Sequence, residues 1–271
     1  MQRRVKYLNN RDLLLQIHKS KATFCSFVAP EYHQYDLIVP SLDKINIRTI
    51  AEAKRNKAAR LSKINHEAAM LEQNKKIPAK GFDIDYRKME KTELVFRVMT
   101  FDHVPKEPGR KKTIKTVADE HEKVNFPPFQ HWKFDDQDNL ICVGKSHWIG
   151  GMENGYFSKT NGKATNELAR MWMKLVDRYA TRGNVRGYTY NDEMKGQAIL
   201  QLAQIGLQFD ESKSQNPFAY YTAAVTNSFV RIINIEKRAQ NIRDDILEQN
   251  GLNPSWTRQN SEVDWNKPKG E

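Results

Sequence analysis

From about residue 160 to about residue 250, apolar residues recur every three to four positions. This is the spacing of the buried face of an α-helix. Arg182-Gly183 ends a first helix, a second begins near Asn191, and Asn216-Pro217 begins a third, with asparagine as the cap and proline at the first helical position. The inward residues that this pattern predicts are Leu168, Met171, Trp172, Leu175, Val176 and Tyr179; Met194, Ala198, Leu202 and Ile205; and Tyr221, Val225, Ser228, Phe229, Ile232 and either Ile235 or Glu236.

Helical patterns also occur near the N-terminus. In residues 1–24, Asn10 is a candidate N-cap, and Leu13, Leu14 and Ile17 share one face of the helix that follows. Residues 48–76 predict a long, highly charged helix with a narrow apolar stripe, a pattern typical of a solvated helix.

Between these helical parts, residues 77–157 have the alternation and turn residues of β-structure. Leu94–Met99 predicts a strand, and two apolar runs flank Asp135–Asn139 as in a β-hairpin. The aspartates of that turn resemble a fragment of a calcium loop, but the glycine and distal glutamate of such a loop are missing. We therefore predict a small α+β module over residues 25–157.

Composition narrows the class of protein. The chain has 271 residues, a formal net charge of +11 and a pI near 9.5, which modestly favours a polyanionic partner. No apolar run is long enough for a membrane span or a signal peptide. Cys25 and Cys142 are too few for a disulfide framework, so we expect a reducing cytoplasm.

The third predicted helix carries the most specific polar pattern. Asn227, Arg231, Asn234 and Arg238 follow one another at steps of four, three and four, opposite the apolar positions, with Lys237 beside them. Such groups contact phosphates and base edges. Near the start of the same helix lie three aromatic residues, which could stack on unpaired bases: Phe218, Tyr220 and Tyr221. The pattern fits equally well a helix whose aromatics are core and whose arginines are merely solvated.

No catalytic or metal-binding pattern stands out. The histidines are scattered, none pairs with a cysteine at metal-ligand spacing, and no glycine-rich phosphate loop is present. Asp244-Asp245 could be a carboxylate pair but is better explained as helix-surface charge beside Arg243. We expect neither enzymatic activity nor a cofactor.

These residues resemble conserved region 2 of bacterial sigma factors. The resemblance rests on Arg178–Gly183, on Asp192–Phe209, and on Phe209-Asp210 followed by a polar loop, Phe218-Ala219-Tyr220-Tyr221 and an amphipathic helix. Within that family the chain is most similar to the late-transcription sigma factors of T-even-like phages. The segment Tyr7–Leu14 also resembles the beginning of those proteins. The similarity covers about residues 5–20 and 165–240.

The resemblance implies a fold, a function and partners. The fold would be mainly α, a sigma region 2-like helical bundle with an inserted small α+β module, divided into residues 1–24, 25–157, 158–250 and an extended tail, 251–271. The protein would be a phage-encoded subunit that binds the host RNA polymerase core in the host cytoplasm and melts an A/T-rich minus-ten element of late promoters. Five polar residues match the segment that docks on the β′ clamp helices: Asp192, Glu193, Gln197, Gln201 and Gln204.

The same resemblance assigns roles on the third helix. Phe218, Tyr220 and Tyr221 match the melting segment, which captures a flipped adenine, and the stripe from Asn227 to Arg238 matches the segment at the upstream edge of the element. Paired tryptophans of primary sigma factors are replaced here by Ala224 and Val225, as in the phage subgroup. That subgroup ends in a tail that binds the phage sliding clamp, to which Ser261–Trp265, with Val263 and Trp265, is faintly similar. A sliding clamp or a co-activator is therefore a further candidate partner.

Two other classes of protein remain open on the sequence. A single-stranded DNA-binding or replication accessory protein would need the same aromatic and basic residues. A virion structural protein with accidental helical similarity is a third interpretation, against which the order of motifs around Phe209–Tyr221 argues.

Overall fold

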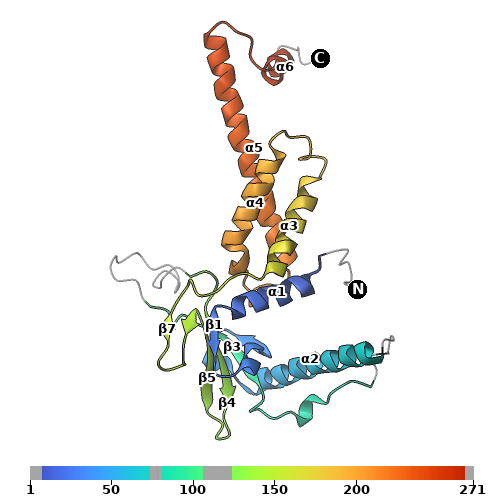
Figure 1. Cartoon of the computed structure of the whole chain (residues 1–271), viewed down its shortest axis with the longest axis vertical. Helices are drawn as coiled ribbons and strands as arrows, with labels where there is room; N and C mark the ends of the chain where they lie inside the picture. The colour runs from blue at the N-terminus through green and yellow to red at the C-terminus, as the bar shows by residue number, and fades with distance from the viewer. Residues whose placement is uncertain (1–7, 74–77, 79–80, 106–123, 266–271) are drawn as a thin grey trace, which may run out of the picture. The chain divides into compact units, whose positions relative to one another are not determined.

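The computed structural model describes residues 8–73, 78, 81–105 and 124–265, with side chains described to residue 260. It contains both helices and a five-stranded sheet (Figure 1). The fold is mixed α and β, and its described strands all lie within residues 25–157, where the α+β module was predicted. The prediction of a mainly α fold is therefore confirmed only in part. The reason is that the sheet joins short strands that lie far apart in the chain, which local periodicity cannot reveal.

Two compact units make up the chain. The first comprises residues 1–171 and 205–218, and the second residues 172–204 and 219–271. These limits do not coincide with the predicted boundaries at residues 24, 157 and 250, because the first helix and the segment before the last long helix belong to the same unit as the sheet.

The first unit is built on the sheet. Its strands lie in the order β1-β5-β4-β3-β2, with β2 and β3 parallel and the other pairs antiparallel. The parallel pair requires a long crossover, which α2 supplies. The strands are β1 (Cys25–Phe27), β2 (Leu37–Val39), β3 (Val95–Met99), β4 (Phe129–Phe134) and β5 (Leu140–Ser146), and a separate ribbon pairs β6 (Trp148–Ile149) with β7 (Tyr156–Phe157).

The predicted hairpin is confirmed as β4 and β5. Phe134 pairs with Leu140, and the Asp135 carboxylate accepts hydrogen bonds from the backbone N–H groups of Gln137 and Asn139. Asp138 has φ 63°, a left-handed conformation that suits a turn. The aspartates of this segment therefore shape the turn.

Two helices accompany the sheet. In α1 (Asn10–Ala22) the cap is Asn9, one residue before the predicted one, since its side chain accepts a hydrogen bond from the Asp12 N–H. The long charged helix is confirmed as α2 (Ile47–Gln73), which buries only Ala53 and Ala58. Its N-terminal part covers a core of sheet residues, namely Val39, Leu94, Phe96, Val98 and Phe134.

Charged side chains are buried in the first unit, which the sequence does not indicate. Lys21 is 1% exposed, and its ammonium lies 2.7 Å from both the Glu211 carboxylate and the Phe209 carbonyl oxygen. The Arg97 guanidinium lies 3.9 Å from the ring centroids of both Tyr35 and Phe129. The Lys21 contacts connect α1 to the segment that precedes α5, and the Arg97 contacts connect β3 to Tyr35 and to Phe129 of β4.

His131 holds Arg97 through a defined tautomer. Its Nδ1 lies 2.6 Å from the Tyr32 carbonyl oxygen, which can only accept, so Nδ1 carries the proton. Its Nε2 is then free to accept from the Arg97 Nε–H at 3.0 Å. Burial first, and then the charge of Arg97, lower the pKa of His131 well below 6.5, consistent with a neutral ring.

The second unit contains the three predicted helices. They are α3 (Asn166–Ala180), which begins in the first unit, α4 (Asn191–Ile205) and α5 (Pro217–Gln249). The predicted inward residues of all three are buried, except that Met171 and Ile205 are half-buried. The last predicted position of α5 is wrong for Ile235, which is 50% exposed, and Glu236 is half-buried. The rings of Trp172 and Tyr221, and of Tyr179 and Phe229, meet edge to face with centroids 5.9 and 5.0 Å apart. Helical periodicity therefore identified this core correctly.

The predicted extended tail is wrong for residues 256–265, which form α6 (Trp256–Trp265). Gly251, with φ 69°, ends α5, and the Leu252 N–H donates to the Leu247 carbonyl oxygen. Asp244 on α5 then accepts hydrogen bonds from the N–H and the hydroxyl of Ser255, at the start of α6. Contacts made by α5 thus stabilise a helix whose own sequence is polar.

Among the described residues, short 3-10 turns also occur at Pro30–His33, Leu42–Lys44, Tyr86–Lys88 and Gly206–Gln208.

Candidate nucleic-acid interface

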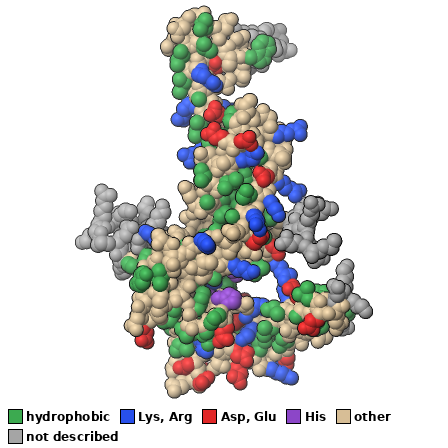
Figure 2. Space-filling view, viewed as in Figure 1, with side chains coloured by type: hydrophobic (Ala, Val, Ile, Leu, Met, Phe, Trp, Pro, Cys, Tyr) green, Lys and Arg blue, Asp and Glu red, His purple; other side chains and the backbone are tan. Residues whose placement is uncertain are grey.

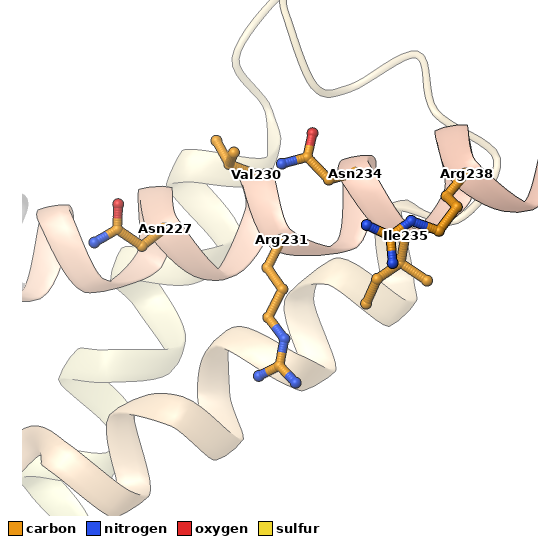
Figure 3. A pocket seen from close by; sticks show the side chains of 6 residues that line it. All are labelled: Asn227, Val230, Arg231, Asn234, Ile235 and Arg238. Atoms are coloured by element: carbon orange, nitrogen blue, oxygen red, sulfur yellow. The ribbon is translucent and has the colours of Figure 1, made fainter.

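The predicted polar stripe lies on one exposed face of α5. Asn227, Arg231, Asn234 and Arg238 are all exposed, and Lys237 is exposed beside them. Together with Val230 and Ile235, the four stripe residues line a shallow groove along the helix (Figure 3). The structure therefore brings the predicted stripe residues together on one surface.

The side chains of this stripe are available to a ligand. Within the described part of the chain, no hydrogen bond or ion pair engages the side chains of Asn227, Arg231, Asn234, Lys237 or Arg238. Two guanidinium groups and two amides in a row offer donors for phosphate oxygens and both donors and acceptors for base edges. The face can hold a nucleic-acid strand without first breaking internal contacts.

The three aromatic residues at the start of α5 have different environments. Tyr221 is fully buried against Trp172, so a base cannot stack on it in this conformation. Tyr220 is half-buried, its ring centroid lies 5.5 Å from that of Tyr221, and burial raises the pKa of its hydroxyl. Phe218 is 40% exposed. The assignment of Tyr221 to base stacking thus conflicts with its place in the core.

Tyr220 is the aromatic residue in line with the stripe. It precedes Asn227 by seven residues, which is two helical turns, whereas Phe218 precedes it by nine, which points to the opposite face. The Phe218 N–H donates to the Asn10 side chain at the first turn of α5, so α1 also caps this helix. Among the three, Tyr220 has the best position to continue the stripe.

The predicted polymerase-docking residues lie on the outer side of α4. Glu193, Gln197 and Gln204 are exposed, and Gln201 is half-buried beside them. Asp192 is exposed on the flank and forms an ion pair with Lys195, one turn later. The opposite side of the helix is core, with Met194, Ala198 and Leu202 fully buried.

Leu200 was missed by the sequence analysis. It is 57% exposed and lies between Gln197 and Gln204 at helical spacing, so the face has an apolar centre with polar surroundings. Protein interfaces commonly have that composition. The signal was present in the sequence, because Leu200 is two positions from the buried Ala198 and Leu202 and so cannot share their face.

An apolar stripe also lies on the C-terminal half of α5. Ile242 and Ile246 are each 53% exposed, and hydrophobic side chains are visible on that part of the surface (Figure 2). The candidate tail residues Val263 and Trp265 lie within α6, and their side chains are outside the described residues. Their assignment to a sliding clamp stays a prediction.

Among the described residues, no group of three or more His, Cys, Asp or Glu side chains is arranged to hold a metal ion. Among the helices of that part of the chain, none combines the length and the apolar character needed to span a bilayer.

Comparison of the chain with protein-family models, with curated proteins and with solved structures found no match.

Proposed function

We propose that the chain is a sigma-like specificity subunit that joins a bacterial RNA polymerase core and directs initiation at A/T-rich minus-ten elements. The observation that carries the proposal is the pair of exposed faces on consecutive helices. The α4 face has Leu200 among glutamines, and the α5 face has the exposed polar stripe of Asn227, Arg231, Asn234 and Arg238, with Tyr220 two helical turns before it. The motifs on α3, α4 and α5 occur in the order that resembles sigma region 2.

On α5, the proposed roles follow from exposure. Arg231 and Arg238 would neutralise phosphates, while Asn227 and Asn234 would contact base edges or the sugar-phosphate backbone. Tyr220 would supply the stacking surface for an extruded base. Such stacking contributes about 1–3 kcal/mol, comparable with the few kcal/mol needed to unstack a base.

Tyr221 would have an indirect role. Its ring lies between Tyr220 and Trp172 in the core and so positions the first turn of α5. Phe218 is exposed on another side of that turn and remains a second candidate for base contact.

On α4, the proposed partner is another helix. Leu200 would be the buried centre of the contact, and Gln197 and Gln204 would form hydrogen bonds around it. The β′ clamp helices of the host polymerase are the partner that the resemblance implies. The protein would act in the host cytoplasm, with promoter DNA and the polymerase core as its principal partners.

The test is transcription in vitro. Core polymerases from several bacterial phyla would each be mixed with the chain on supercoiled templates that carry A/T-rich minus-ten elements. Tyr220→Ala tests melting and Leu200→Asp tests docking, while Arg243→Ala removes an exposed charge of α5 outside the stripe and serves as the control.

The expected result is specific initiation with at least one core polymerase. The docking variant Leu200→Asp should lose both core binding and initiation. The melting variant should bind core normally and fail to open the promoter. The proposal is contradicted if the chain neither binds core polymerase nor supports initiation but binds single strands regardless of sequence. That result would favour the accessory-protein alternative.

A further inference from the structure

The loop between α3 and α4 has an unusual composition. Residues 181–190 read Thr-Arg-Gly-Asn-Val-Arg-Gly-Tyr-Thr-Tyr, and no acidic residue occurs between Arg178 and Asp192. Two arginines, two tyrosines and two glycines thus fall within ten residues. None of them belongs to the α4 face or the α5 stripe.

The loop has a defined conformation. Val185 is 2% exposed and anchors its centre in the core. The Arg186 N–H donates to the Arg182 carbonyl oxygen, and the Tyr188 N–H to that of Val185. The Asn191 side chain closes the loop by donating to the carbonyl oxygens of Ala180 and Val185. The loop therefore presents its outer side chains from a fixed backbone.

Those outer side chains combine cations and aromatic rings. Arg182 and Arg186 are exposed, and in the described structure neither forms an ion pair. The Arg182 guanidinium lies 4.2 Å from the Tyr179 ring centroid, which fixes its direction. The rings of Tyr188 and Tyr190 stack with centroids 5.1 Å apart and planes 29° apart.

Acidic groups near the loop are few and partly neutralised. Asp192 is paired with Lys195. Burial first, then Tyr188 and then Glu236 raise the pKa of Tyr190, which places Glu236 of α5 near that ring. Glu236 is half-buried, whereas both arginines are exposed, so the outer surface of the loop is predominantly positive.

We propose that the loop of residues 181–190 is a second nucleic-acid contact, one that binds single-stranded DNA. Arg182 and Arg186 would bind backbone phosphates, and the stacked pair of Tyr188 and Tyr190 would extend its stack to a base. Arginines alone would suit any acidic surface, but paired tyrosine rings also match the faces of unpaired bases. A loop of this kind lacks the helix or ribbon that usually enters the major groove of a duplex. The site does not depend on the proposed function of α5.

The test measures binding of the full chain to a fluorescent single-stranded DNA oligonucleotide by anisotropy over a series of salt concentrations. The loop variant is Arg182→Ala/Arg186→Ala. Its charge-matched control is Lys63→Ala/Arg243→Ala, which removes two exposed cations elsewhere. Tyr188→Ala and Tyr188→Phe test stacking, and Arg231→Ala/Arg238→Ala reports on the α5 stripe separately.

The loop variant should bind at least about tenfold more weakly, and its slope of log affinity against log salt should fall by about 1.4, or 0.7 for each lost phosphate contact. Tyr188→Phe should keep the affinity that Tyr188→Ala loses, while the control stays close to wild type. The proposal is overturned if the loop variant matches the control, if the wild-type chain binds no oligonucleotide, or if the loop variant loses polymerase binding and keeps DNA binding. If only the stripe variant Arg231→Ala/Arg238→Ala loses DNA affinity, the proposal for the loop is wrong and the promoter-opening proposal is unaffected.

Discussion

Replacing Lys21 by methionine should strongly destabilise the first unit. The Lys21 ammonium is 2.7 Å from the Glu211 carboxylate, and the two side chains are 2% and 7% exposed. Burial lowers the pKa of Lys21, while Glu211 opposes that effect. Burial by itself would raise the pKa of Glu211, but Lys21, Arg97 and His18 together outweigh it and lower the value. The two charges therefore depend on one another for their ionised forms.

The magnitude follows from what the substitution leaves behind. Methionine fills most of the volume of lysine, so the main loss is electrostatic. Removing one partner of a buried pair leaves the other charge uncompensated and costs about 3–5 kcal/mol. For a unit of this size the melting temperature should fall by about 6–20 °C. The freed segment, which includes the Phe209 carbonyl oxygen, directly precedes α5.

Urea unfolding followed by circular dichroism measures the change. Arg11→Ala is the control, because its ion pair with Glu67 is exposed at 72% and 51% and should contribute about 0–1 kcal/mol. In the double variant Lys21→Met/Glu211→Gln, neither charge of the pair remains, so part of the lost stability should return. The reasoning is refuted if Lys21→Met lowers the free energy of unfolding no more than Arg11→Ala does.

Three further outcomes are expected. His131 and His147 are fully buried and neutral, with pKa values held far below 6.5 by burial, to about 3 for His147. Because the unfolded chain binds these protons and the folded chain does not, stability should be complete above pH 6.5. It should fall by about 1.4 kcal/mol per histidine for each pH unit below that, as urea titrations at several pH values would show. Tyr221→Ala should lower the free energy of unfolding by about 3–5 kcal/mol, because it leaves a cavity in the core. Tyr220→Ala should change the melting temperature little. Equal effects of the two substitutions would mean that the two rings do not differ in burial. Asp244→Ala should release α6 and speed proteolysis after residue 250, and unchanged cleavage would show that Ser255 does not depend on that carboxylate.

Much of the second unit follows from local pattern. The three helices and their cores were predictable because one face of each is apolar at a period near 3.6 residues. The polar stripe of α5 follows from the same period, since residues opposite Val225, Phe229 and Ile232 must face outward. The same period also predicts that Leu200, 57% exposed in the structure, faces outward.

Helical periodicity could not decide whether Tyr221 packs in the core or stacks on a base. An aromatic residue next to exposed polar positions fits both a core and a base-stacking surface. The edge-to-face contact with Trp172, about fifty residues earlier in the chain, decides for the core.

The sequence by itself thus determined where helices form between about residues 160 and 250 and which of their faces are buried, because both depend on residues a few positions apart. Tertiary structure alone decided the sheet order, the burial of Lys21 and Arg97, and the helical form of residues 256–265. Each of these depends on partners distant in the chain: Ser146 opposite Cys25, Glu211 beside Lys21, His131 beside Arg97, and Asp244 at Ser255. A charged residue lies at the surface by default, and only a partner brought close by the fold makes its burial stable.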